Sequence, residues 1–313
     1  MTESKLRISR IRPLTDRISE FTLAAPDGAD LPAWDAGSHI RVDVPGGNRA
    51  YSLIAWDDAR GGAAYTIAVQ REEDGTGGSR HMHALTEGDE VAVTLPKCDF
   101  PVTPDAPAVL LAGGIGITPI ISMAHALRAA GMPVTLHYAG RSRGMMAYAA
   151  DLADSLGDAL HIHCDDDSSA LDLDAVIGAL GEAHLYICGP RGMIDAARAR
   201  AEAAGIPSDR VHVELFDNAA QAAGDTAFEV EIASSGEVIT VPPDQSIIEA
   251  LEAAGHDLIY DCQRGDCGIC QTDVISGTPD HRDVVLSDAE RATGKVMQIC
   301  VSRAKSARLV LDL

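Results

Sequence analysis

The sequence has little positive charge, and we expect no segment that directs the chain into a membrane or out of the cell. It has 25 Lys and Arg against 47 Asp and Glu, a net charge of −22. This balance argues against nucleic acid or an anionic membrane as partner, and for a basic protein partner. The N-terminal residues contain no apolar signal-peptide core. Residues 106–127 carry no Asp, Glu, Lys or Arg, but two prolines and three glycines interrupt them, so we expect a strand, a loop and a helix rather than a membrane span.

Internal repeats and low-complexity tails are also absent, and the chain instead changes pattern twice. Short alternating strands fill the first block and predict an antiparallel β-barrel. From Ala108, apolar strands alternate with helices, which predicts an α/β parallel sheet. After a small, polar linker, two strands, a helix and a cysteine-rich loop follow, an α+β pattern. The predicted boundaries are 1–104, 105–216, 217–226 for the linker, and 227–313.

Three of the seven cysteines fall within nine residues. Cys262, Cys267 and Cys270 give C-x4-C-x2-C, and Cys300 follows after a further 29 residues. This is the spacing of plant-type ferredoxins, whose four thiolates hold a 2Fe–2S cluster. A structural zinc site is the competing interpretation, although zinc favours paired C-x2–4-C hooks. Without an export signal we expect a reducing cytoplasm, where clustered thiols bind metal more often than they form disulfides.

The cysteine loop contains no histidine, which speaks against a Rieske centre in it. Gly265 and Gly268 have no Cβ, so we expect the loop to wrap the cluster closely and to aim backbone N–H groups at its sulfurs. Cys98 and Cys164 are expected to have no special role. A metal site at HIHC (161–164) is set aside because strand alternation sends these side chains to opposite faces.

Two loops at strand ends suggest a nucleotide site. Gly113, Gly114 and Gly116 lie between a strand and a helix, where a backbone without Cβ atoms can approach a pyrophosphate. The pattern G-x-G-x-x-P is not the full dinucleotide fingerprint, so a tight strand–helix turn is the alternative. Cys188, Gly189 and Pro190 follow another strand at its carboxyl end, the edge where open α/β sheets bind ligands.

The first block carries residues suited to a phosphorylated flavin. Arg49, Ala50, Tyr51 and Ser52 lie on a strand, and Gly77, Gly78 and Ser79 lie in a loop. The arginine can pair with a phosphate, and the aromatic ring can pack against the isoalloxazine.

In this order, the motifs resemble the phthalate dioxygenase reductase family, which includes the reductases of vanillate-type demethylating oxygenases. The resemblance spans essentially the whole chain and implies a flavin barrel, an NAD domain and a C-terminal β-grasp ferredoxin. It also implies FMN rather than FAD. In related benzoate-type reductases the ferredoxin domain comes first.

The family's site residues map onto this chain one at a time. Arg49 resembles the flavin-phosphate ligand, and Tyr51 and Ser52 resemble the residues that contact the isoalloxazine and its reactive nitrogen edge. Thr118 resembles the residue between flavin and nicotinamide, and Cys188 the residue beside the reacting nicotinamide carbon. The remaining matches are the strand along the flavin ring, the phosphate loop and the aromatic over the flavin face: Ala68, Val69, Gln70, Gly77, Gly78, Ser79 and Phe216. Gln70 departs from the lysine expected in some members.

The implied function is electron transfer from NADH through FMN to the 2Fe–2S cluster, and then one electron at a time to a Rieske-type oxygenase. A flavin can accept two electrons together and return them singly. Alternatives keep the cofactors but change the acceptor to a haem monooxygenase or a free ferredoxin, or make the protein a redox sensor without turnover. Arg141 and Arg143 could hold a 2′-phosphate, yet the resemblance favours NADH. Residues 227–313 hold 15 Asp and Glu against 7 Lys and Arg, a balance of −8, which predicts a basic docking face on the partner.

Overall fold

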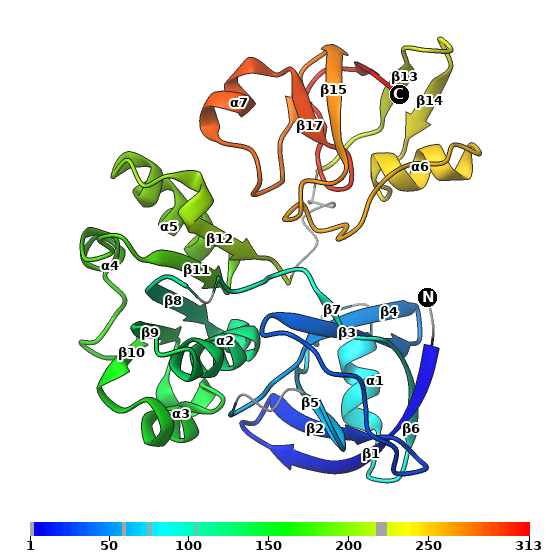
Figure 1. Cartoon of the computed structure of the whole chain (residues 1–313). Coiled ribbons are helices and arrows are strands. Elements are labelled where there is room, and N and C mark those ends of the chain that lie inside the picture. The colour runs from blue at the N-terminus through cyan, green and yellow to red at the C-terminus, as the bar shows by residue number, and fades with distance from the viewer. Residues whose placement is uncertain (1–2, 58–60, 74, 76, 104, 217–223) are drawn as a thin grey trace. The chain divides into compact units, whose positions relative to one another are not determined.

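The structure, a computed structural model, describes residues 1–313 except 1–2, 58–60, 74, 76, 104 and 217–223. It divides into two compact units, Met1–Glu214 and Leu215–Leu313. We call these the N-terminal and the C-terminal unit and describe each by itself (Figure 1).

An antiparallel barrel forms the first half of the N-terminal unit. Its strand order is β4-β3-β6-β1-β2-β5, with β7 paired to β3, so β4 and β5 are the outer strands. Alternating apolar residues such as Ile40, Val42 and Ile67 fill its interior. The elements are β1 (Glu3–Pro13), β2 (Ile18–Ala24), β3 (Ser38–Val44), β4 (Gly47–Ser52), β5 (Ala64–Gln70), α1 (Gly78–Ala84), β6 (Glu90–Thr94) and β7 (Lys97–Cys98).

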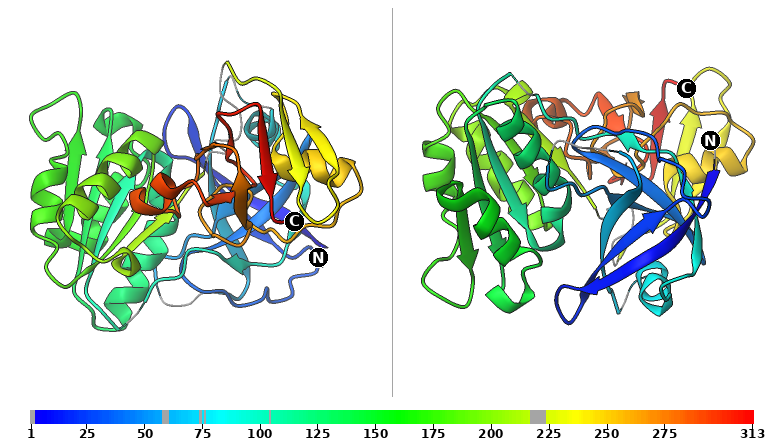
Figure 2. Two further views of the ribbon diagram at one scale, coloured as in Figure 1. Left: turned by 90° about the horizontal axis from the view of Figure 1, so that it is seen from above. Right: turned by 60° about the horizontal axis from the view of Figure 1, so that its bottom comes forward.

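A parallel sheet in the order β10-β9-β8-β11-β12 forms the second half. Helices lie on both of its sides (Figure 2). α2 and α3 pack with Leu110, Tyr138 and Tyr186 in one apolar cluster, so they cover the same face. The elements are β8 (Ala108–Gly113), the 3-10 turn η1 (Gly114–Gly116), α2 (Ile117–Ala129), β9 (Val134–Gly140), η2 (Arg143–Met145), α3 (Ala149–Leu156), η3 (Gly157–Ala159), β10 (Leu160–Cys164), α4 (Leu173–Gly178), β11 (His184–Cys188), α5 (Arg191–Ala203), η4 (Ser208–Arg210) and β12 (Val211–Glu214).

The C-terminal unit has a mixed sheet in the order β14-β13-β19-β15-β17 and a two-stranded ribbon, β16-β18. Capping boxes of Ser246 with Glu249 and of Ser287 with Glu290 start its two helices, because each serine oxygen accepts an otherwise unpaired backbone N–H. The elements are β13 (Phe228–Ile232), β14 (Val238–Val241), α6 (Ile247–Ala253), β15 (Gln271–Ser276), β16 (Pro279–Asp280), α7 (Asp288–Thr293), β17 (Val296–Gln298), β18 (Arg303–Ala304) and β19 (Arg308–Leu311).

The predicted fold class is confirmed: an antiparallel barrel, a parallel α/β sheet and an α+β domain follow one another along the chain. The domain boundaries stay predictions, and residues 217–223 of the predicted linker lie outside the described residues. None of the helices in the described part of the chain is long and apolar enough to cross a membrane. Residues 106–127 form β8, η1 and α2, as the prolines and glycines indicated.

Candidate functional site

The four cysteines with ferredoxin spacing lie together in the C-terminal unit. Cys262, Cys270 and Cys300 are buried, and Cys267 is partly exposed. The thiols of Cys267 and Cys300 hydrogen-bond to the Cys262 sulfur and lower the pKa of Cys262, and a hydrogen bond from Cys300 lowers the pKa of Cys270. Hydrogen bonds therefore link all four sulfurs, which is the convergence that a shared cluster requires.

Backbone N–H groups of the same loop point at the sulfurs. The N–H of Arg264 donates to Cys262 Sγ at 3.3 Å, and the backbone at Ile269 hydrogen-bonds to Cys267. Such donors stabilise thiolates and tune the potential of a cluster. The residues present therefore fit a 2Fe–2S cluster.

The two loop glycines also have a packing role that the sequence did not indicate. Gly265 and Gly268 have φ angles of 84° and 77°, in the left-handed region that favours glycine. A Cβ on Gly265 would lie 2.6 Å from Val301 Cγ2, and one on Gly268 would lie 3.3 Å from Val285 Cγ1. Their missing side chains thus leave room for neighbouring protein segments.

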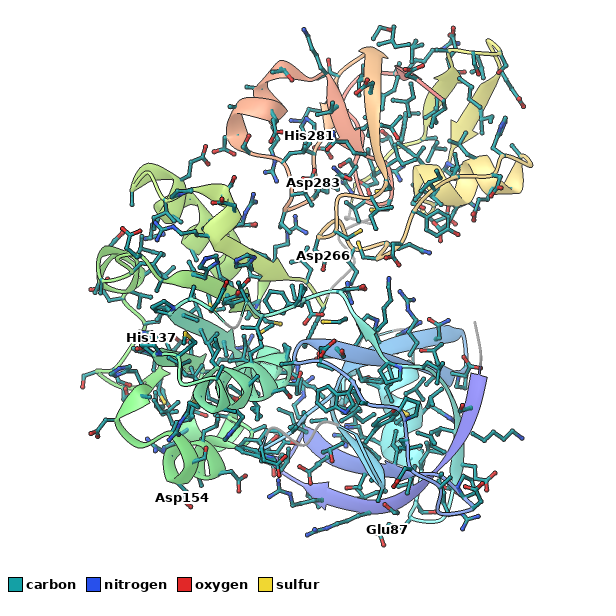
Figure 3. All side chains as sticks on the ribbon, in the orientation of Figure 1. Glu87, His137, Asp154, Asp266, His281 and Asp283 are labelled. Carbon is teal, nitrogen blue, oxygen red and sulfur yellow. The ribbon has the colours of Figure 1, made fainter. Side chains whose placement is uncertain are left out.

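Asp266 of this loop, whose side chain is only 5% exposed, was missed by the sequence analysis (Figure 3). Its carboxylate accepts the backbone N–H of Leu215 at 3.1 Å and lies 3.3 Å from the Arg264 guanidinium. Burial raises the pKa of Asp266 to about 7. The sequence could have pointed to Asp266, because it lies between Arg264 and the ligand candidate Cys267 in the same loop.

In the barrel, neighbouring residues of β4 face opposite sides. Tyr51 pairs with Ile40 of β3 and packs against the barrel core, whereas Ser52 pairs with His39. Ser52 therefore points to the other face of the sheet. Burial raises the pKa of Tyr51 to about 12 despite the nearby charge of Arg49, so its phenol is neutral at pH 7.

Arg49 lies against the start of α1. A Cβ on Gly78 would lie 3.1 Å from Arg49 Cγ, so only glycine lets this side chain cross the first turn. Gly77, at the N-cap, has a φ of 100°, and the first turn holds no acidic residue. Ser79 Oγ accepts the N–H of Glu72 at 3.0 Å and holds the loop to the segment after β5. A guanidinium beside backbone N–H groups suits a phosphate.

The side chains of β5 that were predicted to lie along the flavin face different sides of the sheet. Ala68 packs in the cluster shared with α2, whereas Val69 is in the barrel core. A ligand on the α2 side of β5 could therefore meet Val69 only through its backbone. The Gln70 amide donates to a Glu72 carboxylate oxygen, which gives this side chain a partner within the protein.

Helix α2 is fixed directly to the end of β4. Ser122 Oγ donates to the carbonyl of Leu53 at 2.8 Å and accepts the N–H of Ala55 at 3.0 Å. Thr118 lies one turn earlier on the same side of the helix, is buried, and donates to the Ile115 carbonyl at 3.1 Å. Thr118 is therefore on the side of α2 that meets the segment after Ser52.

The two glycine loops of the parallel sheet interlock. A Cβ on Gly116 would lie 2.3 Å from the Cys188 carbonyl oxygen, and one on Gly189 would lie 2.9 Å from Gly113 Cα. Pro190 would be 2.5 Å from a Cβ on Gly113. Loop packing thus explains these glycines. At Gly114, where φ is 55°, nothing lies within 4 Å of a Cβ, so this position alone of the four is open to a ligand.

The remaining predicted site residues differ in how exposed they are: Cys188, Phe216 and Arg141. Cys188 ends β11 beside Ala112 of β8 and is fully buried. Phe216, in the C-terminal unit, is 38% exposed. Arg141 is exposed after β9. Hydrogen bonds from Ser169 lower the pKa of the Asp167 carboxyl, and the nearby charge of Arg143 lowers it further. Asp167, the last of three consecutive aspartates (165–167), therefore lies near this arginine.

The reasoning that set aside HIHC was wrong about the two histidines. His161 and His163 share one face of β10, and both rings stack on His137 of β9, at centroid distances of 4.9 and 5.3 Å. Residues two apart on a strand point the same way, so Cys164 lies with Ile162 on the opposite face. Burial and the two neighbouring histidines lower the pKa of His137 to about 4.

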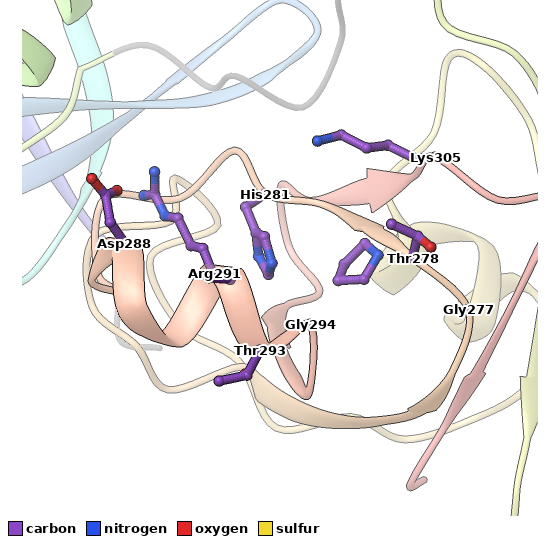
Figure 4. A pocket seen from close by; sticks show the side chains of 10 residues that line it. Gly277, Thr278, His281, Asp288, Arg291, Thr293, Gly294 and Lys305 are labelled. Atoms are coloured by element: carbon purple, nitrogen blue, oxygen red, sulfur yellow. The ribbon is translucent and has the colours of Figure 1, made fainter.

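A pocket of about 630 Å³ lies in the C-terminal unit between α7 and the segments around β16 and β18 (Figure 4). His281, Arg291 and Lys305 are among its lining residues, and Asp288 adds a carboxylate. No residue predicted from the sequence to bind a cofactor lines this pocket.

Comparisons with known proteins define the class of protein first. The family model of the oxidoreductase NAD-binding domain matches residues 110–199, and that of the 2Fe-2S iron-sulfur cluster binding domain matches residues 230–305. The chain is thus an oxidoreductase with a nucleotide domain and an iron–sulfur domain.

Full-length relatives define the family. The phenoxybenzoate dioxygenase subunit beta of Ectopseudomonas oleovorans is 42% identical over 100% of this chain and 98% of its own length. The phthalate dioxygenase reductase of Burkholderia cepacia is 40% identical over 99% and 97%. A solved phthalate dioxygenase reductase, a modular structure for electron transfer from pyridine nucleotides to [2Fe-2S], has a TM-score of 0.73 at 39% identity over 99% and 98%. This chain belongs to the phthalate dioxygenase reductase family.

Part of a solved intact type IV self-sufficient cytochrome P450 monooxygenase is also similar: it matches 99% of this chain at 37% identity with a TM-score of 0.74, and this chain spans 41% of its length. Full-length CYP116B46 from Tepidiphilus thermophilus matches 99% of this chain at 35% identity with a TM-score of 0.76, and this chain spans 42% of its length.

Proposed function

We propose that this protein carries electrons from NADH through FMN and a 2Fe–2S cluster to a Rieske-type oxygenase, one electron at a time. The convergence of Cys262, Cys267, Cys270 and Cys300 is the observation that carries the proposal. Relatives that are parts of dioxygenase systems support an oxygenase as the acceptor. When bound, the flavin accepts two electrons together and returns them singly.

The barrel supports FMN as the flavin. Arg49 and the start of α1 suit one phosphate group, and Tyr51 can cover the apolar ring beside the outer strand β4. Ser52 faces the side of the sheet where α2 attaches, so its hydroxyl can serve the reacting edge of the ring. Thr118 on α2 can lie between the flavin and the nicotinamide.

The sheet edge around Gly114 supports NADH binding, with its backbone open to the pyrophosphate. Cys188, Gly189 and Pro190 would approach the nicotinamide from the end of β11, and Arg141 the adenosine ribose. The carboxylates next to Arg143 oppose a second phosphate there and favour NADH over NADPH. A ratio of catalytic efficiencies that favours NADPH would overturn this preference.

The surface near the cluster supports a protein partner. Ile269, between two ligand cysteines, is 49% exposed, and Cys267 is itself partly exposed. Acidic residues dominate the surrounding domain, so the partner would present a basic face. The rate of electron transfer to the oxygenase should then fall as salt rises; a rate that is equal at low and high ionic strength contradicts steering by charge. We assign the protein to the cytoplasm, where the thiols stay reduced.

An anaerobic visible spectrum before and after one equivalent of NADH tests the proposal. Flavin and cluster bands should both bleach within the time of mixing. A flavin band without a cluster band would refute the cluster assignment and favour a zinc-bearing flavin reductase. Rapid reduction of cytochrome c by NADH would exclude a sensor without turnover.

A haem monooxygenase is the second candidate acceptor, because an intact self-sufficient cytochrome P450 monooxygenase contains a stretch similar to 99% of this chain. Reconstitution with purified oxygenases of both kinds separates the two. The acceptor that gives substrate oxidation coupled to NADH consumption identifies the partner.

A further inference from the structure

A network of polar contacts ties the barrel to the start of α3 within the N-terminal unit. The Tyr148 hydroxyl donates to Glu20 Oε2 at 2.9 Å, and Arg12 donates to both oxygens of the same carboxylate, at 3.0 and 2.9 Å. Glu20 lies on β2 opposite Arg12 of β1, whereas Tyr148 is the N-cap residue of α3. Arg12 Nη1 also lies 3.6 Å from Asp151 Oδ2 in α3. Two strands of the barrel thus hold the first turn of one helix of the α/β half.

The central contact of this network is buried. Tyr148 is 4% exposed and Glu20 is 8% exposed, and the Arg12 guanidinium lies 5.5 Å from the centroid of the Tyr148 ring. Burial and the Glu20 carboxylate raise the pKa of the Tyr148 phenol well above its usual range, so its hydroxyl stays a donor. Hydrogen bonds to a charged group are stronger than those between neutral groups. The contact therefore holds the two halves together more firmly than an exposed ion pair would.

The backbone of Tyr148 adopts an unusual conformation to make this contact. Its φ and ψ angles are 62° and 11°, in the left-handed region that bulky side chains seldom adopt. Such conformations persist where the surrounding structure requires them, and they are frequent at functional sites. The same ring meets Trp56 edge to face at a centroid distance of 5.4 Å. Trp56 follows soon after β4, so Tyr148 touches the barrel at two separate places.

The network adjoins the strand on which we place the flavin ring. Glu20 lies directly opposite Ala68 of β5, so the two side chains share a face of the sheet. Ala68 and Tyr148 belong to the same apolar cluster. The hydrogen bond from Ser122 of α2 to Leu53 is a second link between the halves. One polar link by itself would let the parallel sheet turn about it, whereas a second link through a different helix fixes the angle.

This angle matters because, in the proposed function, the two halves hold different reactants. We place the flavin on β4 and β5, and the nicotinamide at the carboxyl ends of β8 and β11. One hydride, two electrons together with one proton, has to pass between them, and the reacting atoms must approach to about 3–3.5 Å. A misplacement of about 1 Å can slow such a step by about 10²-fold. The angle between the halves thus controls the rate of hydride transfer more than the affinity for NADH.

We infer that Tyr148, held by Glu20 and Arg12, is a positioning residue for hydride transfer: it fixes the parallel sheet against the barrel so that nicotinamide and flavin meet at reacting distance. This inference rests on the proposed function. NADH is oxidised and the flavin is reduced by the one hydride. Tyr148 gives up no proton and forms no covalent bond in the step.

The test uses the full-length protein loaded with FMN and cluster, as wild type, Tyr148→Phe and Tyr65→Phe. Tyr65 is the matched control, because it is also buried and its hydroxyl donates one hydrogen bond, to the Pro32 carbonyl at 2.8 Å, within the barrel half. Anaerobic stopped flow follows flavin bleaching at increasing concentrations of NADH, and of NADH deuterated at the transferred position. In Tyr148→Phe the limiting rate should fall about tenfold, as for a displacement of about half an ångström. The Kd for NADH should stay within about twofold and the isotope effect should persist, whereas Tyr65→Phe should react as wild type.

Two further measurements separate positioning from a loss of stability. The charge-transfer absorption of reduced flavin with NAD⁺ depends on the overlap of the two rings, so it should weaken in Tyr148→Phe and not in Tyr65→Phe. Glu20→Gln keeps an acceptor for the tyrosine but loses the charge that Arg12 grips, and it should also slow the limiting rate. Because both residues act through one contact, the double variant should be no slower than the slower single variant. Glu20→Gln carries the test if Tyr148→Phe does not fold.

The outcomes distinguish the two proposals. A wild-type limiting rate in Tyr148→Phe overturns the inference, and so does one in Glu20→Gln where the first variant does not fold. Slowing that comes only from a weaker Kd for NADH, or that is equal in Tyr65→Phe, overturns it as well. Wild-type protein that binds no flavin, or whose flavin NADH does not bleach, refutes the proposed function instead.

Discussion

The interlocked glycine loops allow a prediction that separates a folding role from a binding role. In Gly116→Ala, the new Cβ would lie 2.3 Å from the carbonyl oxygen of Cys188 and 2.7 Å from the backbone N of Gly189. Both atoms belong to backbone, so no side-chain rotation relieves the clash. Overpacking of this kind costs about 1–3 kcal/mol, and we expect the upper end. For a unit of this size, that corresponds to a fall in Tm of about 6–12 °C.

Gly114→Ala is the matched control, two residues away. Its Cβ meets nothing within 4 Å, and only the φ of 55° costs energy, about 1 kcal/mol or about 2–4 °C. Because we expect the NADH pyrophosphate to approach this position, the variant should bind NADH at least about tenfold more weakly. Thermal unfolding and fluorescence titration with NADH measure the two effects. A Gly116→Ala protein that melts within 2 °C of wild type would show that the loops do not interlock as described.

Three further predictions concern the flavin, the cluster and pH. Arg49→Met should raise the Kd for FMN by about 30-fold, from the loss of about 2 kcal/mol of charge-assisted hydrogen bonding, while Arg7→Met, on β1 where the arginine pairs with Glu90, should leave it unchanged in a flavin fluorescence titration. Cys300→Ser should remove the cluster absorption and leave NADH-dependent flavin bleaching intact; persistence of the cluster spectrum would exclude Cys300 as a ligand. Because the pKa of His137 is about 4 when folded and about 6.5 when unfolded, the unfolded chain binds the extra proton between these values. Stability should therefore fall as pH drops from 6.5 to 4, by about 1 kcal/mol after solvent screening, and His137→Gln should flatten this part of a urea-midpoint profile against pH.

The sequence by itself determined the order of the domains and the chemistry of the cluster. Alternating and continuous apolar patterns distinguish a half-exposed barrel from a parallel sheet covered on both faces. The spacing of Cys262, Cys267, Cys270 and Cys300 is local for three ligands, and few other chemistries use it. Both signals depend on residue type and short-range periodicity, which need no knowledge of the fold.

Only the tertiary structure decided which residues distant in sequence lie against one another. It showed that Ser52, His39 and Lys97 lie opposite one another on three strands, because register sets which side chains are opposite and no sequence period reports register across strands. It assigned three of the four loop glycines to packing against another loop and left Gly114 open, because the space around a Cβ depends on segments far away in the chain. It also brought His137 against the two histidines of β10, a contact fixed by the order of parallel strands rather than by the motif itself.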